Sequence, residues 1–201
     1  MTATPVRRTQ EERRATTRAK LLDAAAACLL ERGYAATTVG EVQERAGVAR
    51  GTLLHHFPTK VDLMVAATGH VTAQRIEGFR KAAAAIPEGD DRLDAVIDLA
   101  WQDLNGPVFF TALELWVAAR TDADLRAAVA ALEEELFRSM RESYAEVLGD
   151  SFGDATYPIE FTIDLLTGLS ITTMVSGQLG PRQRVLDRWK KSLRMLIEEQ
   201  S

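Results

Sequence analysis

The residues best suited to polar recognition lie close together between positions 50 and 60. They include two cations, two adjacent histidines and small residues that let a backbone approach another molecule closely. Side chains of these types donate hydrogen bonds to phosphate oxygens and to the edges of bases. The candidate contact residues are Arg50, Gly51, Thr52, Leu54, His55, His56 and Lys60.

Other kinds of chemistry find less support in the sequence. Only His70 joins the pair His55 and His56, and no Cys/His ligand spacing is present, so we expect no metal site and no cofactor. The chain has no HExxH motif and no phosphate-cradling glycine loop, and Glu133-Glu134-Glu135 is typical of a solvated helix face. We therefore do not expect an enzyme. The single cysteine, Cys28, falls in an apolar helical pattern and should be a buried side chain.

The distribution of charge separates the chain into two parts. The net charge is −5, which alone argues against a nucleic-acid partner. Residues 1–60 carry ten Lys or Arg against six Asp or Glu, whereas residues 61–201 carry 14 against 23. A basic N-terminal part on an acidic body indicates one end that faces phosphates and a body that phosphates repel.

Apolar periodicity predicts the helices that position the candidate residues. Leucines and alanines recur at helical spacing over residues 10–32, and Gly33 follows as a helix stop. Thr38 followed by Glu41 has the spacing of a capping box, which starts a second helix that runs to about residue 46.

A third, short helix is expected over residues 49–55, after a tight corner at Gly47. A second capping box, Thr59 with Asp62, starts a long fourth helix that ends near residue 85. Two short helices joined at a corner form a helix-turn-helix, in which the second enters the major groove of DNA and the first braces across the backbone. The residues expected to face inward and hold this motif together are Val39, Val42, Ala46, Val48, Leu53 and Phe57.

The segments 33–39, 46–48 and 51–63, at these spacings, resemble the TetR family of bacterial transcriptional regulators. The resemblance implies a homodimer, two recognition helices in successive major grooves and a small-molecule effector bound in the body. It also implies that Arg50, Gly51 and Thr52 lie against bases, with Arg50 reading guanine. The residues implied to contact phosphates are Thr38, His56 and Lys60 and, from the N-terminal arm, Arg13, Arg14 and Arg18.

Two positions depart from the family's pattern. Leu54 stands where the family usually has tyrosine, so a hydroxyl that would contact phosphate or base is lost, although leucine can pack on a thymine methyl. Ala49 replaces the usual serine before the recognition helix, so that helix lacks a side-chain N-cap, at a cost of about 1 kcal/mol. Both departures bear on the operator sequence and the affinity, and not on the fold.

The rest of the chain also has helical patterns, and no segment has the pattern of a strand. Thr121 and Asp124 are expected to cap the third of these later helices. The fold class is therefore all-α with about nine helices: an N-terminal helix-turn-helix DNA-binding domain, residues 1–63, and a larger effector-binding and dimerisation domain, residues 64–201. The later helices are expected over residues 91–104, 107–120, 122–148, 158–176 and 182–199.

Large apolar side chains are concentrated in the central helices. Any single one is more often plain core than pocket, but helical bundles commonly bind ligands between their helices. No array of buried bases is evident there, so we expect a largely apolar or amphipathic effector, with polar contributions from Thr111, Glu114, Tyr144, Thr162 and Asp164. The candidate ligand-binding residues are Trp101, Leu104, Phe110, Leu113, Trp116, Phe137, Tyr144, Phe161 and Leu165.

The last two helices favour an oligomer interface. Residues 159–175 are apolar on more than one face and include small residues, but they are short for a membrane span and carry two acidic side chains. Paired with the final helix and a two-fold mate, they would form a four-helix bundle. The candidate interface residues are Ile163, Leu166, Ser170, Met174, Trp189, Leu193 and Leu196.

These patterns predict a ligand-responsive repressor that binds a palindromic operator as a homodimer and is released when an effector shifts the fourth helix. Activation in place of repression stays open. The N-terminus lacks the apolar region of a secretory signal, so we expect a cytoplasmic protein with no membrane partner. The alternative is a helical ligand-binding or scaffold protein with a vestigial DNA-binding head, which salt-sensitive DNA binding would distinguish.

Overall fold

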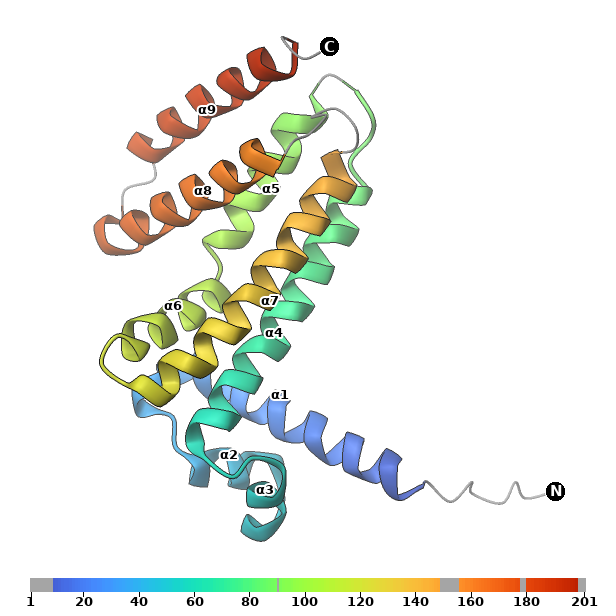
Figure 1. Ribbon diagram of the computed structural model, residues 1–201, viewed down its shortest axis with the longest axis vertical. Coiled ribbons are helices and arrows are strands. Elements are labelled where there is room, and N and C mark those ends of the chain that lie inside the picture. The colour runs from blue at the N-terminus through green and yellow to red at the C-terminus, as the bar shows by residue number, and fades with distance from the viewer. Residues whose placement is uncertain (1–8, 90, 149–155, 178–179, 199–201) are drawn as a thin grey trace, which may run out of the picture. The chain divides into compact units, whose positions relative to one another are not determined.

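The computed structural model describes residues 9–89, 91–148, 156–177 and 180–198, most of which lie in helices (Figure 1). Within these ranges the structure has nine helices and no strand, which confirms the all-α prediction. The helices are α1 (Gln10–Ala36), α2 (Val39–Ala46), α3 (Arg50–His56), α4 (Lys60–Ala84), α5 (Arg92–Leu104), α6 (Pro107–Ala119), α7 (Ala123–Leu148), α8 (Thr156–Ser176) and α9 (Gly180–Glu198).

The chain divides into two compact units. The first combines Met1–Val71 with Thr111–Leu132, and the second combines Thr72–Phe110 with Glu133–Ser201. The chain therefore passes from one unit to the other within α4, α6 and α7. The predicted DNA-binding domain, residues 1–63, which we call the head, belongs to the first unit together with parts of α6 and α7. The domain boundary after residue 63 stays a prediction.

Helix α1 begins with a capping box that the sequence analysis did not identify. The Thr9 hydroxyl accepts from the Glu12 N–H at 3.2 Å, and the Glu12 carboxylate accepts from the Thr9 N–H at 2.9 Å. Gly33 interrupts the helix as predicted, because its φ of 76° and ψ of 174° are not helical. One further turn continues to Ala36.

The core of the first unit is formed by α1, α2, α3 and the start of α4. Val42, Leu53 and Phe57 are buried there, as predicted, and so is the free thiol of Cys28. Burial of these side chains stabilises α2 and α3, which are too short to form stable helices alone. The buried residues of this core are Leu21, Leu22, Ala24, Ala25, Cys28, Leu29, Val42, Leu53, Phe57, Leu63, Met64 and Ala67, with Val39, Ala46 and Val48 packed against them.

A second apolar cluster of the first unit joins α6 and the start of α7 to the head. Its buried side chains pack against Tyr34, which follows the kink in α1, and against Val61 and Val65 of α4. The head is therefore not an isolated three-helix domain within this unit. The buried members of the cluster are Leu115, Ala119, Leu125 and Val129.

The N-terminus of α7 is capped differently from the prediction. The Asp122 carboxylate accepts from the Leu125 N–H at 2.9 Å. The Thr121 hydroxyl instead donates to the Ala118 carbonyl at 3.4 Å, at the end of α6. The predicted cap by Thr121 with Asp124 is therefore wrong, because the turn between the helices ends one residue later than the sequence pattern suggests.

In the second unit, α5, α8 and α9 pack against one another (Figure 1). Polar contacts also fasten α9 to α5. The Lys190 ammonium, on a side chain that is 8% exposed, lies 2.5 Å from Asp98, and Arg194 pairs with Asp94. The apolar side chains buried in this unit include Val96, Ile97, Ala100, Trp101, Leu104, Ile159, Ile163, Leu166, Leu186 and Leu193.

Among the described helices, only α8 is long and apolar enough, over Pro158–Ser176, to pass a test of length and composition for a membrane span. Ile163, Leu166 and Ser170 of this helix are almost fully buried inside the second unit. The core helix of a globular protein passes the same test.

Candidate nucleic-acid interface

The corner between α2 and α3 has the geometry of a helix-turn-helix. Gly47 adopts a left-handed conformation, with φ 64° and ψ 36°, and its N–H bonds to the carbonyls of Gln43 and Glu44. Glycine is the residue that takes this conformation at least cost. Helix α3 then begins at Arg50, and Ala49 at its N-cap makes no side-chain cap hydrogen bond, as predicted.

Helix α3 is anchored on one face and open on the other. Leu53 and Phe57 are 1% and 4% exposed and hold the helix against the core. A Cβ added at Gly51 would meet nothing within 4 Å, so the opposite face is unobstructed. The structure brings five of the predicted contact residues together on the exposed part of this helix, and their contact with bases stays a prediction. They are Arg50, Gly51, Thr52, Leu54 and His55.

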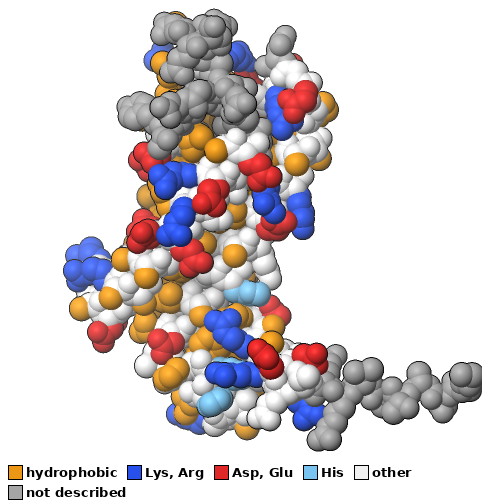
Figure 2. Space-filling model, turned by 45° about the vertical axis from the view of Figure 1, so that its right-hand side comes forward, with side chains coloured by type: hydrophobic (Ala, Val, Ile, Leu, Met, Phe, Trp, Pro, Cys, Tyr) orange, Lys and Arg blue, Asp and Glu red, His pale blue; other side chains and the backbone are white. Residues whose placement is uncertain are grey.

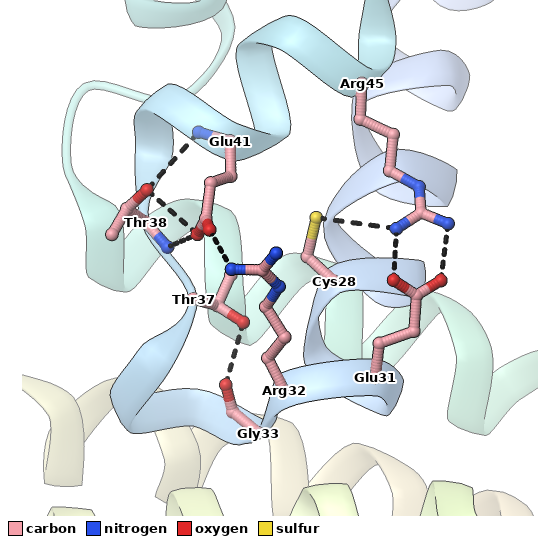
Figure 3. Close-up of polar contacts among 8 residues, drawn as sticks. All are labelled: Cys28, Glu31, Arg32, Gly33, Thr37, Thr38, Glu41 and Arg45. Atoms are coloured by element: carbon pink, nitrogen blue, oxygen red, sulfur yellow. Dashed lines mark hydrogen bonds and ion pairs between the residues drawn. The ribbon is translucent and has the colours of Figure 1, made fainter.

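Ion pairs between α1 and α2 fix the bracing helix (Figure 3). The Arg45 guanidinium donates to both Glu31 oxygens at 2.7 and 2.5 Å, and it also lies 4.0 Å from the Cys28 sulfur. This hydrogen bond from Arg45 holds the pKa of Glu31 below its ordinary value. Arg32 of α1 pairs with one carboxylate oxygen of Glu41 of α2. The two pairs orient α2, and through the corner they orient α3.

Thr38 acts in the structure as the N-cap of α2 (Figure 3). Its hydroxyl accepts from the Glu41 N–H at 3.3 Å, and its own N–H donates to the Glu41 carboxylate at 3.0 Å. The backbone hydrogen bond from Thr38 is the main cause that lowers the pKa of Glu41. The predicted capping box is confirmed, and the predicted phosphate contact of Thr38 stays a prediction.

Positive charge gathers where the end of α3 meets α1. His56 is half-buried, and its pKa is lowered by burial first and then by the charges of Arg14, His55 and Arg18. The Arg18 guanidinium lies over the Phe57 ring, 5.4 Å from its centroid. In Figure 2 histidine and basic side chains lie close together on the part of the visible face that carries the head. This field suits an anionic partner.

Lys60 is less free than its predicted role requires. Its ammonium donates to the Tyr34 carbonyl at 3.3 Å and lies 5.0 Å from the centroid of the Tyr34 ring. An ammonium carries three donors, so a phosphate contact is compatible with this placement. The contact nevertheless gives Lys60 a second role, because it holds the last turn of α1 after the kink at Gly33.

Glu114 of α6 contacts the same last turn of α1, and this contact was not predicted from the sequence. Its carboxylate accepts from the Tyr34 N–H at 2.7 Å. A Cβ added at Gly33 would collide with this carboxylate, lying 3.0 Å from its carbon. The sequence analysis placed Glu114 among the polar residues of a ligand cavity, and no signal in the sequence joins residues 80 positions apart.

The predicted ligand-binding residues are divided between the two units. Leu113 and Trp116 belong to the first unit, and Trp116 packs on its α6–α7 cluster. Phe161 is 40% exposed and packs against Trp189, with ring centroids 4.5 Å apart. Tyr144 borders a narrow apolar crevice between α5, α8 and α9. The remaining predicted residues, buried or half-buried in the second unit, are Trp101, Leu104, Phe110, Phe137 and Leu165.

A wider opening in the second unit lies between α4 and α5. It has a volume of about 410 Å³. It is lined by charged, amide and apolar side chains, and none of them is among the predicted ligand-binding residues. Arg75, whose side chain is 10% exposed, pairs there with Asp103, so one buried base lies at this opening. The lining residues are Arg75, Gly78, Phe79, Ala82, Leu99, Gln102 and Asp103.

The predicted interface residues include both buried and exposed side chains. Ile163, Leu166, Ser170 and Leu193 are wrong as interface residues, because they are 0 to 2% exposed and face the interior of their own unit. Trp189 is half-buried and donates to the Thr162 hydroxyl at 2.9 Å. Met174 and Leu196 are exposed, and their place in an interface stays a prediction. The exposed large apolar side chains of α8 and α9 are Phe161, Met174, Val175, Val185, Met195 and Leu196.

Two features bear on enzymatic chemistry. Within the described residues no three His, Cys, Asp or Glu side chains are grouped closely enough to hold a metal ion. The segment Gly149-Asp150-Ser151-Phe152-Gly153 matches the GxSxG spacing of a hydrolase nucleophile, and it lies outside the described residues. A nucleophile elbow follows a strand, whereas helices α7 and α8 flank this segment.

Comparison with known proteins agrees with this geometry. Residues 21–67 match the family model described as bacterial regulatory proteins, tetR family. An uncharacterised HTH-type transcriptional regulator of Mycobacterium tuberculosis is 33% identical over 153 residues, which cover 76% of this chain and 78% of the relative. The HTH-type transcriptional regulator CymR of Pseudomonas putida is 39% identical over 122 residues, covering 61% of this chain and 60% of CymR.

Solved structures share the fold. The transcriptional regulator FadR from Bacillus subtilis, in complex with stearoyl-CoA, superposes with a TM-score of 0.59 at 19% identity, covering 86% of this chain and 95% of FadR. One assignment follows from the open face of α3, the left-handed corner at Gly47 and the extent of these similarities. The chain belongs to the TetR family of bacterial regulatory proteins and is a helix-turn-helix transcriptional regulator.

Proposed function

We propose that this regulator is a ligand-responsive repressor that binds a palindromic operator as a homodimer in the cytoplasm. The observation that carries the proposal is the exposed face of α3, which is anchored by Leu53 and Phe57 and bordered by the basic cluster at His56. One short helix buries too little surface for useful specificity, so two copies are needed.

In this proposal Arg50 reads a guanine and the basic cluster contacts phosphates. Arg50→Ala is expected to weaken operator binding by about 1–3 kcal/mol and to relax the preference at one base pair. Arg120→Ala is the matched control, since it removes the same charge from an exposed position outside α1 to α3. Fluorescence anisotropy at fixed salt, on an operator and on a scrambled duplex, measures both. Equal loss on the two duplexes would assign Arg50 to the backbone and would refute its role as a base reader.

The homodimer is proposed to form through the exposed apolar residues of α8 and α9. Val175, which is 80% exposed, lies among them. Val175→Glu should shift the dimer toward monomer, because a charge would be buried at the interface. Val117→Glu is the control, at a position on α6 that is 64% exposed. Sedimentation velocity measures the oligomeric state of both variants. A Val175→Glu protein that stays dimeric would place the interface elsewhere.

Release from DNA is proposed to follow effector binding in the second unit. The open cleft between α4 and α5 supports this proposal, since its volume is that of a small-molecule site. The FadR structure with stearoyl-CoA shows a ligand bound to one protein of this fold. A bound effector would favour one arrangement of α4, the helix that runs from the cleft to the head. The alternative of a vestigial head has no support in the geometry of α2 and α3.

A further inference from the structure

The Arg75 guanidinium in the second unit is buried with one of its donors unpaired. Its side chain is 10% exposed, and burying a cation is costly unless its donors are paired. Arg75 donates from Nη1 to Asp103, and from Nη2 to the Met140 sulfur at 3.8 Å. Its Nε is buried and has no hydrogen-bond partner among the described residues.

The unsatisfied donors lie along one edge of the guanidinium. Nε and Nη2 point in the same direction, and this edge is one that binds a carboxylate through two parallel hydrogen bonds. A thioether sulfur is a weak acceptor, so Met140 fills the space without satisfying the donors. Methionine is also flexible and easily displaced, because it has three rotatable bonds.

The existing partner leaves room for a second anion. Burial raises the pKa of Asp103 although the charge of Arg75 acts to lower it, so this carboxylate is poorly solvated. It occupies only the Nη1 side of the guanidinium. Asp103 already matches the charge of Arg75, so a second anion leaves excess negative charge at the site. A monoanion leaves less of this excess than a phosphate, which carries more charge.

The surroundings of Arg75 suit an apolar body. The cleft of about 410 Å³ reaches Arg75, with Phe79 and Leu99 as its large apolar side chains. Phe79 stacks on Tyr144, with ring centroids 5.0 Å apart, one helical turn beyond the Arg75–Met140 contact. The small residues Gly78 and Ala82 lie beside Phe79 on the α4 side of the cleft.

We propose that the effector is a small carboxylic acid with an apolar body, whose carboxylate binds the Nε and Nη2 edge of Arg75 in place of the Met140 sulfur. The proposal rests on the proposed function, because it names the class of effector for that regulator. Asp103 keeps its bond to Nη1, and the apolar body extends into the cleft beside Phe79 and Leu99.

The test compares matched probes on the full-length protein. The probes are octanoate and 4-phenylbutanoate, each beside its own amide and the corresponding ammonium compound, with affinity measured by isothermal titration calorimetry. The carboxylates should bind about ten- to a hundredfold more tightly than their amides, because the hydrogen bonds to Arg75 are charge-assisted. The proposal is overturned if neither carboxylate binds more tightly than its amide, or if the ammonium compounds bind best.

Two variants separate binding from folding. Asp103→Asn leaves Arg75 with its charge and should bind the carboxylates at least as tightly as the wild type. The double variant Arg75→Gln/Asp103→Asn has no unpaired charge, so it should fold, and it should lose the preference for carboxylate over amide. Retention of the preference in the double variant would refute the role of Arg75.

Operator release distinguishes this inference from the proposed function. If the protein binds a selected operator and the carboxylates fail to bind the protein, the inference fails and the DNA-binding function stands. If the carboxylates bind and do not release the operator, the site stands and the ligand-responsive part of the proposed function fails.

Discussion

Substituting Gly33 tests the link between α6 and the head. Gly33 has a φ of 76° and a ψ of 174°, a region that only glycine occupies readily, so alanine there costs about 1–3 kcal/mol. The added Cβ would also displace the Glu114 carboxylate and break its bond to the Tyr34 N–H. Because Glu114 is exposed, that bond contributes about 1 kcal/mol. Gly33→Ala should therefore cost about 2–4 kcal/mol.

A double-mutant cycle separates the two contributions. Urea unfolding of Gly33→Ala, Glu114→Ala and the double variant gives each free energy of unfolding. Glu114→Ala relieves the collision, so the double variant should be about 1 kcal/mol more stable than additivity predicts. Gly40→Ala is the control, since its Cβ would meet only the Thr38 hydroxyl at 3.9 Å within α2. A Gly33→Ala protein as stable as wild type, or a strictly additive cycle, would refute the reasoning.

Three further predictions concern α3 and its surroundings. Leu53→Ala should cost about 2–5 kcal/mol in urea unfolding and abolish DNA binding, whereas the 41% exposed Leu54→Ala should change stability by less than about 0.5 kcal/mol; equal effects would contradict the assigned orientation of α3. Ala49→Ser should stabilise the protein by about 1 kcal/mol, because it supplies the missing N-cap, and an unchanged urea midpoint would contradict this. His56 has a pKa below its ordinary value of 6.5, so its contribution to stability is lost as the pH falls below that value. Phosphate contact would raise the pKa again, so DNA affinity measured by anisotropy should rise from pH 8 to pH 6, and a slope that survives His56→Gln would rule out this residue as its source.

Local signals allowed much of the head to be predicted. The capping boxes at Thr38 and Thr59 depend on side chains three residues apart, and both form as expected. The glycine at position 47 is required by a left-handed backbone, which is also a local property. Burial of Leu53 and Phe57 follows from helical spacing once the corner is placed.

Long-range contacts could not be predicted in the same way. The bond from the Tyr34 N–H to Glu114 and the pairing of Arg75 with Asp103 join helices whose packing no local pattern encodes. The misplaced interface residues have a related cause. Helix α8 is apolar on more than one face, so its sequence does not reveal which face is buried, and Ile163 and Leu166 turn inward.

Selection of bound sequences from a random duplex library tests the central claim most directly. A dimeric regulator should enrich an inverted repeat whose half-site centres lie about 10–10.5 base pairs, or a multiple of that, apart, because two α3 helices enter successive major grooves. Binding to the selected site should weaken steeply with salt. A library with no enriched sequence, or with a single unrepeated half-site, would contradict a dimeric operator-binding regulator.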